Sequence, residues 1–203
     1  MTTNPMDSDQ VRQAIDFHGH WCPGLAIGVR AAQWALQEMG QAPDEEIVAV
    51  VETDMCGVDA VQALVGCTFG NGNLIHKDYG KNAFTFYRRR DGKSARIVFN
   101  SAIYGDARLQ LGRLHRKQLE EGLSPDEEKL WKETRAAASR RVMEADLEAL
   151  FEVKPAVEPV PQKARILASL ICDACKEAVM ETRTRRMHEQ TLCIPCFEAR
   201  EKR

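Results

Sequence analysis

The segment Phe17-His18-Gly19-His20-Trp21-Cys22-Pro23-Gly24 places two imidazoles and a thiol at alternate positions, directly before a Pro-Gly step. In extended backbone, alternate side chains point to the same side, so His18, His20 and Cys22 are expected to converge. A thiolate together with imidazoles suits zinc or a related transition metal. The segment therefore predicts part of a metal site.

A helix is expected to begin immediately after Cys22. Pro23 fits the first helical position, and apolar residues then recur at helical spacing until Gly40. A helix N-terminus lowers the pKa of a thiol, so Cys22 is expected to be the thiolate that a metal requires. The alternative is a buried cysteine beside two packing or capping histidines.

A second group of candidate ligands follows the apolar run Ile47–Val51, which predicts a buried strand. Thr53 and Asp54 are expected to cap the next helix, whose first turns carry Cys56 and Asp59 on one face. Junctions between a strand end and a helix often hold ligands. Cys56 is therefore a candidate metal ligand or redox thiol, and Asp59 a candidate catalytic acid or ligand. The alternatives are a small core cysteine and a first-turn acid that favours the helix dipole.

Residues 66–73 are too rich in glycine and asparagine for regular structure and predict a loop whose backbone amides can approach a ligand. The loop is not a P-loop, because no Gly-Lys-Ser/Thr follows the glycines. Strands are expected over 74–76, 83–88 and 95–100, with a hairpin at Asp91-Gly92. The candidate pocket residues of this region are Cys67, Gly70, Asn73, His76, Tyr79 and Lys81, of which Lys81 is a candidate proton carrier. The turn 77–81 is alternatively solvated surface.

These segments together resemble the FmdE family, named for the FmdE component of tungsten/molybdenum formylmethanofuran dehydrogenase. The resemblance rests on Phe17-His18-Gly19-His20-x-Cys22-Pro23-Gly24, on residues 52–59 and on residues 66–81. It implies an α+β domain with a metal near the His-x-His-x-Cys element. Through the family name it also implies a link to the reversible reduction of carbon dioxide to the formyl level on methanofuran. The chain would then be a component of an oxidoreductase whose metal-pterin centre lies on other subunits.

Four cysteines near the C-terminus form two pairs, Cys172-x-x-Cys175 and Cys193-x-x-Cys196, separated by 17 residues. This spacing is typical of a structural zinc site with four thiolates. Two disulfides would be the alternative in an oxidising compartment. The second pair and its surroundings also resemble the DksA/TraR-type zinc finger, which concerns architecture more than function.

A helical extension and a linker are expected between the two sites. One helix is predicted over 106–122, and Ser124-Pro125-Asp126-Glu127 is a capping box that begins another, running to about Leu150. The charged residues 129–141 suggest a solvated or partner-facing surface. We therefore expect an α+β main domain over 1–152 with its core at about 10–105 and a mixed or antiparallel sheet packed with helices. A proline-rich linker over 153–163 and a zinc finger over 164–203 would follow.

Composition limits the partners and the compartment. A formal net charge of −2 over 203 residues argues against nucleic acid as an obligatory partner, which needs a basic surface; residues 183–186 are a local basic exception. No apolar run approaches the roughly twenty residues that span a bilayer, and residues 1–10 lack the apolar segment of a secretory signal. We expect a cytoplasmic protein with reduced or metal-bound cysteines, and a homodimer.

Two functions are compatible with the sequence. In the first, His18, His20, Cys22 and Cys56 hold zinc or another transition metal, and Asp59 or Lys81 moves protons or orients a one-carbon or carbonyl substrate. In the second, the protein is a regulatory accessory that senses a ligand, a metal or a redox state and docks through the finger. A shell of three protein ligands and water would favour catalysis, and a closed shell of four would favour structure or sensing.

Overall fold

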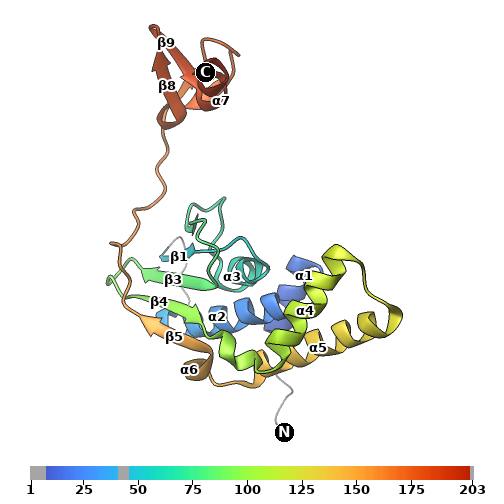
Figure 1. Ribbon diagram of the computed structural model, residues 1–203. Helices are drawn as coiled ribbons and strands as arrows, with labels where there is room; N and C mark the ends of the chain where they lie inside the picture. The colour runs from blue at the N-terminus through green and yellow to red at the C-terminus, as the bar shows by residue number, and fades with distance from the viewer. Residues whose placement is uncertain (1–7, 41–45, 202–203) are drawn as a thin grey trace. The chain divides into compact units, whose positions relative to one another are not determined.

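The computed structural model describes residues 8–40 and 46–201 and divides into two compact units, one ending at Lys163 and one beginning at Ala164. The first unit is an α+β fold with a mixed sheet, as predicted (Figure 1). Its helices are α1 (Asp9–His18), α2 (Pro23–Met39), α3 (Gly57–Val65), η2 (Ser101–Tyr104), α4 (Ala107–Glu120), α5 (Pro125–Glu144) and α6 (Leu147–Leu150). Its strands are β1 (Ile47–Val51), β2 (Leu74–His76), β3 (Ala83–Arg88), β4 (Ser94–Phe99) and β5 (Phe151–Lys154).

The sheet has the strand order β2-β1-β3-β4-β5, in which only β1 and β2 are parallel. The strands predicted from β-branched and aromatic runs are present, but β5 was not predicted. Val153 and Lys154, expected in the linker, instead pair with Ile97 and Arg96 of β4. Only Phe151 of β5 is buried, so this edge strand has no alternating pattern that the sequence could reveal.

Helix α2 is the central element of the core. Ten of its residues are buried, and it packs against α1, α3, α5 and β3. Because it has neighbours on several sides, its apolar residues surround the helix rather than form one stripe. The side chains of Phe84, Phe86 and Ile97, on the same face of the sheet, are fully buried in this core.

The N-terminal halves of α2 and α3 touch backbone to backbone. A Cβ on Gly28 would lie 2.2 Å from the carbonyl oxygen of Gly57 and 2.5 Å from its Cα. A Cβ on Gly24, one turn earlier, would lie 3.2 Å from Cβ and 3.7 Å from Sγ of Cys56. Side chains at these glycines would hold the helices apart, so their absence is what brings Cys56 to the start of α2.

Gly28→Ala is expected to destabilise the first unit by about 3 kcal/mol, because the new methyl group would overlap the backbone of Gly57. In calorimetry the midpoint temperature of unfolding of this unit should fall by roughly 6–12 °C. Gly112→Ala is the matched control, since Gly112 lies in α4 where an added Cβ would meet no atom within 4 Å, and alanine there should stabilise the helix by about 0.5–1 kcal/mol. Equal transition temperatures for the two variants would contradict the close helix contact.

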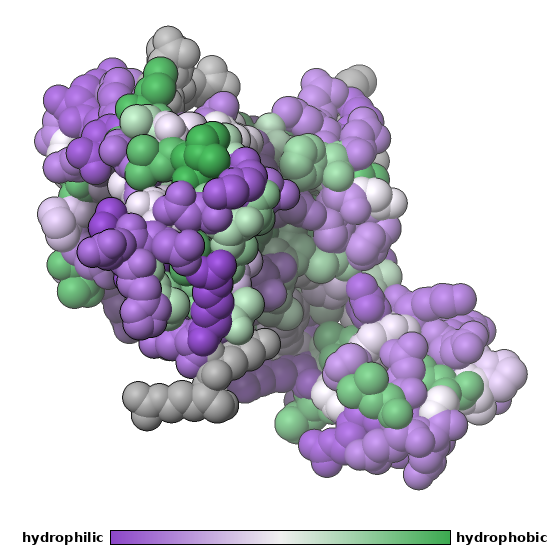
Figure 2. All heavy atoms as spheres, turned by 90° about the horizontal axis from the view of Figure 1, so that it is seen from above, coloured by the Kyte–Doolittle hydropathy of each residue, from purple (hydrophilic) through white to green (hydrophobic). Residues whose placement is uncertain are grey.

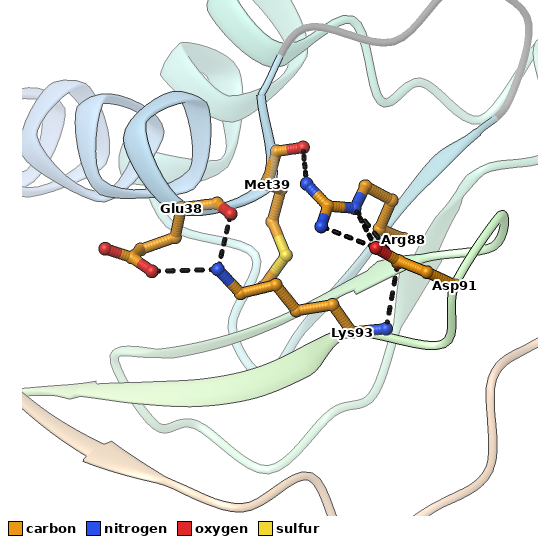
Figure 3. A network of polar contacts seen from close by, with 5 residues as sticks. All are labelled: Glu38, Met39, Arg88, Asp91 and Lys93. Atoms are coloured by element: carbon orange, nitrogen blue, oxygen red, sulfur yellow. Dashed lines mark hydrogen bonds and ion pairs between the residues drawn. The ribbon is translucent and has the colours of Figure 1, made fainter.

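The hairpin between β3 and β4 holds the C-terminal end of α2 (Figure 3). Arg88 donates to the carbonyl oxygen of Met39 at 2.7 Å, and Lys93 donates to that of Glu38 at 2.7 Å. Asp91 keeps Arg88 in place through bonds of 3.0 and 2.6 Å, and this pairing lowers the pKa of Asp91 to about 2. The cations thus satisfy carbonyl groups that the helix end leaves without intrahelical partners.

The predicted capping box of the helical extension is present, with Ser124 accepting from the amide of Glu127 and Glu127 accepting from that of Ser124. The extension differs from its prediction in two other respects. Helix α5 ends at Glu144 instead of near Leu150, because the extended backbone of Ala145 separates it from α6. The charged stretch 129–141 is also not simply solvated, since α5 packs against α2 and α4 and its small residues form a narrow buried stripe; these are Thr134, Ala138 and Ser139.

The segment after β5 covers part of the opposite face of the sheet. Ala156 and Val160 pack on the cluster formed by Val48, Val50 and Tyr87. The hydroxyl of Tyr87 donates to the carbonyl oxygen of Glu158 at 3.3 Å, and Arg89 donates to those of Pro161 and Gln162 at 3.0 and 2.8 Å. The proline-rich segment predicted as a linker is therefore attached to the first unit as far as Gln162.

Among the described residues, no helix is both long enough and apolar enough to cross a bilayer. Figure 2 shows a face on which hydrophilic side chains predominate and hydrophobic ones form separate patches.

Candidate metal centres

The N-terminal candidate site is formed where α1 ends and α2 begins. His18 is the last residue of α1, Gly19 has a left-handed φ of 93°, and Cys22 is the extended N-cap of α2. The donor atoms of His18, His20 and Cys22 all lie within 4.8 Å of one another. The predicted convergence is present, but a helix end and a left-handed glycine produce it rather than one extended strand.

His18 is oriented by a carboxylate from α3. Its Nδ1 lies 2.7 Å from Oδ2 of Asp59, whereas its Nε2 is buried without a hydrogen-bond partner. With the proton on Nδ1, the lone pair of Nε2 is free to bind a metal. In many metal sites a carboxylate that does not bind the metal fixes the tautomer of a ligating histidine in this way. The structure thus places Asp59 behind His18.

The two thiols of the site have different surroundings. Cys22 is 3% exposed, and its Sγ accepts from the amide of Leu25 at 3.3 Å, at the N-terminus of α2. Cys22 is therefore a buried thiol whose sulfur accepts a hydrogen bond from the first turn of the helix. Burial, and then the hydrogen bond and charge of Cys22, raise the pKa of the Cys56 thiol. Cys56 immediately precedes α3, which begins at Gly57, so Thr53 and Asp54 do not form the predicted cap.

These residues fit a bound transition metal. Two imidazoles and one thiolate form a borderline-to-soft donor set, which suits zinc. Without a metal, the buried Nε2 of His18 has no partner, and buried polar atoms without a hydrogen bond are uncommon in proteins. His18, His20 and Cys22 could therefore hold the ion, and Cys56 is the additional thiol beside them.

A cavity of about 420 Å³ begins at these thiols. Besides Cys22 and Cys56 it is lined by Met55 and by residues from the 3-10 helix and the helical extension, including Tyr104, Leu111, His115, Trp131 and Arg135. Burial raises the pKa of Tyr104 to about 12, so its phenol stays protonated at neutral pH. The sequence did not identify these wall residues, because a single aromatic residue in a charged helix does not by itself indicate a binding site.

The glycine-rich loop does not reach this cavity. Cys67 is fully buried with its Sγ 3.4 Å from the carbonyl oxygen of Ile47, and burial raises its pKa to about 12. Asn73 donates to the same oxygen at 3.0 Å and accepts from the amide of Thr68 at 2.9 Å. Both residues thus brace the loop against β1, while Gly70 is exposed with open space around it.

Lys81 and Tyr79 line a different cavity of about 360 Å³, on the face of the sheet opposite α2. The Nζ of Lys81 lies 5.9 Å from the centroid of the Tyr79 ring. Arg96 and Glu52 form an ion pair in the wall of this cavity. Arg96 donates to both carboxylate oxygens of Glu52 at 2.6 and 2.8 Å and lowers the pKa of Glu52. His76 ends β2 and is exposed. The structure therefore separates these candidates from His18, His20 and Cys22.

Asp59→Asn is expected to weaken N-terminal metal binding by about 10- to 100-fold, because an amide stabilises the required His18 tautomer less well than a carboxylate. Competition with a chromophoric chelator measures the affinity. Asp54→Asn is the matched control, since Asp54 is exposed and precedes the same helix. Unchanged affinity in Asp59→Asn would show that the bond to His18 does not support the metal.

The C-terminal unit, called the finger below, gathers four cysteines. Its elements are β6 (Ser169–Ile171), β7 (Ala178–Met180), η3 (Glu181–Arg183), β8 (Thr184–Met187), β9 (Gln190–Cys193) and α7 (Ile194–Glu201). The Sγ atoms of Cys172, Cys175, Cys193 and Cys196 lie within 4.8 Å of one another. The amide of Cys193 donates to Sγ of Cys172 at 3.3 Å, and backbone amides lower the pKa of Cys172 to about 6. This is a four-thiolate zinc site.

Both units of the chain match known protein families. Residues 17–152 match the family model described as FmdE, molybdenum formylmethanofuran dehydrogenase operon. Residues 165–202 match the prokaryotic dksA/traR C4-type zinc finger. The crystal structure of an FmdE-like protein of tungsten formylmethanofuran dehydrogenase type from Syntrophus aciditrophicus is similar, with a TM-score of 0.61, 25% identity and 98% coverage of each chain.

One curated relative has a different description. A probable S-adenosyl-L-methionine-binding protein of Archaeoglobus fulgidus is 34% identical over 199 residues. The alignment covers 91% of this chain and 51% of that protein, so the chain spans about half the length of the relative. The family model covers the candidate metal site, the sheet and the helical extension. The chain therefore belongs to the FmdE family and carries a dksA/traR-type C4 zinc finger.

Proposed function

We propose that the N-terminal site is a metal-dependent reaction centre with three protein ligands, His18, His20 and Cys22, and an open position facing the larger cavity. The observation that carries this proposal is the buried Nε2 of His18, which has no partner although Asp59 holds the opposite side of the ring at 2.7 Å. Three protein ligands and an open position are typical of catalytic zinc.

A zinc ion bound here would supply a Lewis acid that polarises a carbonyl group or lowers the pKa of water. The protein residues have separate tasks. Asp59 orients His18, and the amide of Leu25 donates to Sγ of Cys22 and holds it in place. Tyr104 presents a protonated phenol in the cavity wall, suited to donate a hydrogen bond to a substrate oxygen.

We propose a small carbonyl or formyl compound as the substrate class. The resemblance to the FmdE component of formylmethanofuran dehydrogenase supports it. Zinc does not change its oxidation state, so a redox step would take place in a complex with other subunits that carry electrons. The Archaeoglobus relative makes S-adenosyl-L-methionine a second candidate ligand, because the similarity extends over most of this chain.

The alternative is a cytoplasmic accessory protein that senses a ligand or a metal and docks through its finger. Cys56 favours this alternative if it closes the shell as a fourth ligand, because a complete shell leaves no position for substrate. A homodimer is compatible with both functions and can be tested by light scattering.

Cobalt substitution of the full chain tests the open position. Co²⁺ in the N-terminal site should change its visible spectrum when azide is added, while the four-thiolate cobalt site of the finger should not. Subtracting the spectrum of Cys22→Ser, which keeps only the finger site, isolates the N-terminal signal. A signal insensitive to azide, with intensity typical of four protein ligands, would refute the catalytic proposal and support the accessory one.

A further inference from the structure

Two cavities meet at Cys22. Beside the larger one lies a second cavity of about 320 Å³, also lined by Cys22, Pro23, Trp131 and Arg135. The indole of Trp131 and the guanidinium of Arg135 therefore form a wall that both cavities share. A ligand that extends from one cavity into the other would pass this pair.

The shared wall contains an aromatic platform with a cation above it. The ring of Trp131 is stacked with that of His115, with centroids 6.1 Å apart and planes 13° from parallel. The Cζ of Arg135 lies 5.3 Å from the centroid of Trp131. Stacked rings of this kind accept a flat apolar group, and the guanidinium can bind a planar anion with two parallel hydrogen bonds.

The charges around the smaller cavity are unbalanced. It is lined by Arg135 and Lys132, and no Asp or Glu lines either cavity, although the chain has 30 acidic residues. Within the described ranges neither cation has an ion-pair partner. The cavity on the opposite sheet face differs, because its Arg96 is paired with Glu52.

An unsatisfied donor points to the same conclusion. Trp21 lines the smaller cavity, and its Nε1 is buried without a hydrogen-bond partner. Buried N–H groups are rarely left unpaired, so this N–H needs an acceptor that the described residues do not supply. The half-buried guanidinium of Arg135 and the nearby exposed ammonium of Lys132 together suit an acceptor with negative charge.

We propose that these two cavities bind an organic anion with a flat apolar body. A carboxylate or phosphate group would be held by Arg135, Lys132 and the N–H of Trp21. The body would lie along Trp131 and Leu111 in the larger cavity, beside the metal donors. The inference rests on the proposed function only for the role of the metal; anion recognition follows from the cavity walls.

The test uses three naphthalene probes, 2-naphthoate, 2-naphthyl phosphate and the neutral 2-naphthamide, titrated into the zinc-loaded full chain by calorimetry. At least one anion should bind at least about tenfold more tightly than the amide, because a charged group contributes more than a neutral one. The anion that binds more tightly identifies carboxylate or phosphate as the preferred group.

Arg135→Gln should weaken binding of that anion by about tenfold or more while leaving the amide unchanged. Lys132→Gln should give a smaller loss and provides a second variant. Arg140→Gln is the matched control, because Arg140 is exposed on the same helix and lines neither cavity. The proposal is wrong if the amide equals the anions, if no probe binds, or if Arg140→Gln loses as much as Arg135→Gln.

Zinc content, measured on the same samples, separates this proposal from the proposed function. Anion binding to a chain that takes up zinc only in the finger would refute the metal-dependent reaction centre alone. Two zinc ions with no preference for anions would refute only the anion site.

Discussion

Cys172→Ser is expected to release the C-terminal zinc and unfold the finger, while the first unit remains folded. The buried sulfur of Cys172 accepts from the amide of Cys193, and a neutral hydroxyl cannot replace this charged ligand. The finger has a small apolar cluster around Leu192, so most of its folding free energy must come from the metal. Hydrogen exchange should show loss of protection over residues 164–203 only.

Cys67→Ser is the control for this experiment, because it makes the same chemical change in the other unit. Its finger should keep full protection and its zinc. Loss of protection throughout residues 25–100 in Cys172→Ser would contradict the independence of the two units.

Cys22→Ser is expected to lower the metal content of the full chain from about two equivalents to about one. Sγ of Cys22 lies with the nitrogens of His18 and His20 inside 4.8 Å, and serine would remove the sulfur ligand of this group. Elemental analysis of metal-replete protein measures the loss. Repeating the substitution in the Cys172→Ser background should leave almost no bound metal.

Cys67→Ser should retain both equivalents, because Cys67 is buried against Ile47 with its pKa raised to about 12 and is therefore a neutral thiol. If Cys22→Ser kept both metals while Cys67→Ser lost one, the site would be built around the loop 66–73. Wild-type protein with a single equivalent would instead exclude an N-terminal metal.

Local signals in the sequence were sufficient for several parts of this protein. The helix that begins at Pro23, the strand Ile47–Val51 and the capping box of Ser124 and Glu127 depend on residues within a few positions of one another. The finger was also predictable, since two Cys-x-x-Cys turns at a suitable spacing have few other uses. Short-range hydrogen bonding, periodic burial and ligand spacing are written directly into the order of residues.

The tertiary structure decided what surrounds the N-terminal donors. Asp59 meets His18 across 41 positions, and Cys56 reaches Cys22 because the backbones of Gly28 and Gly57 touch. Such contacts depend on how two helices pack, which their separate periodicities do not specify.

The larger cavity and strand β5 also depend on contacts between segments that are distant in the sequence. Trp131 and Arg135 lie on α5, which packs against α2 and α4 through small buried residues and leaves these longer side chains in a cavity wall with Cys22 and Cys56. Strand β5 is held by its ladder to β4, and only Phe151 among its side chains is buried. The sequence by itself therefore determined the elements with strong local patterns and the ligand types. Packing between distant segments decided which side chains share a site.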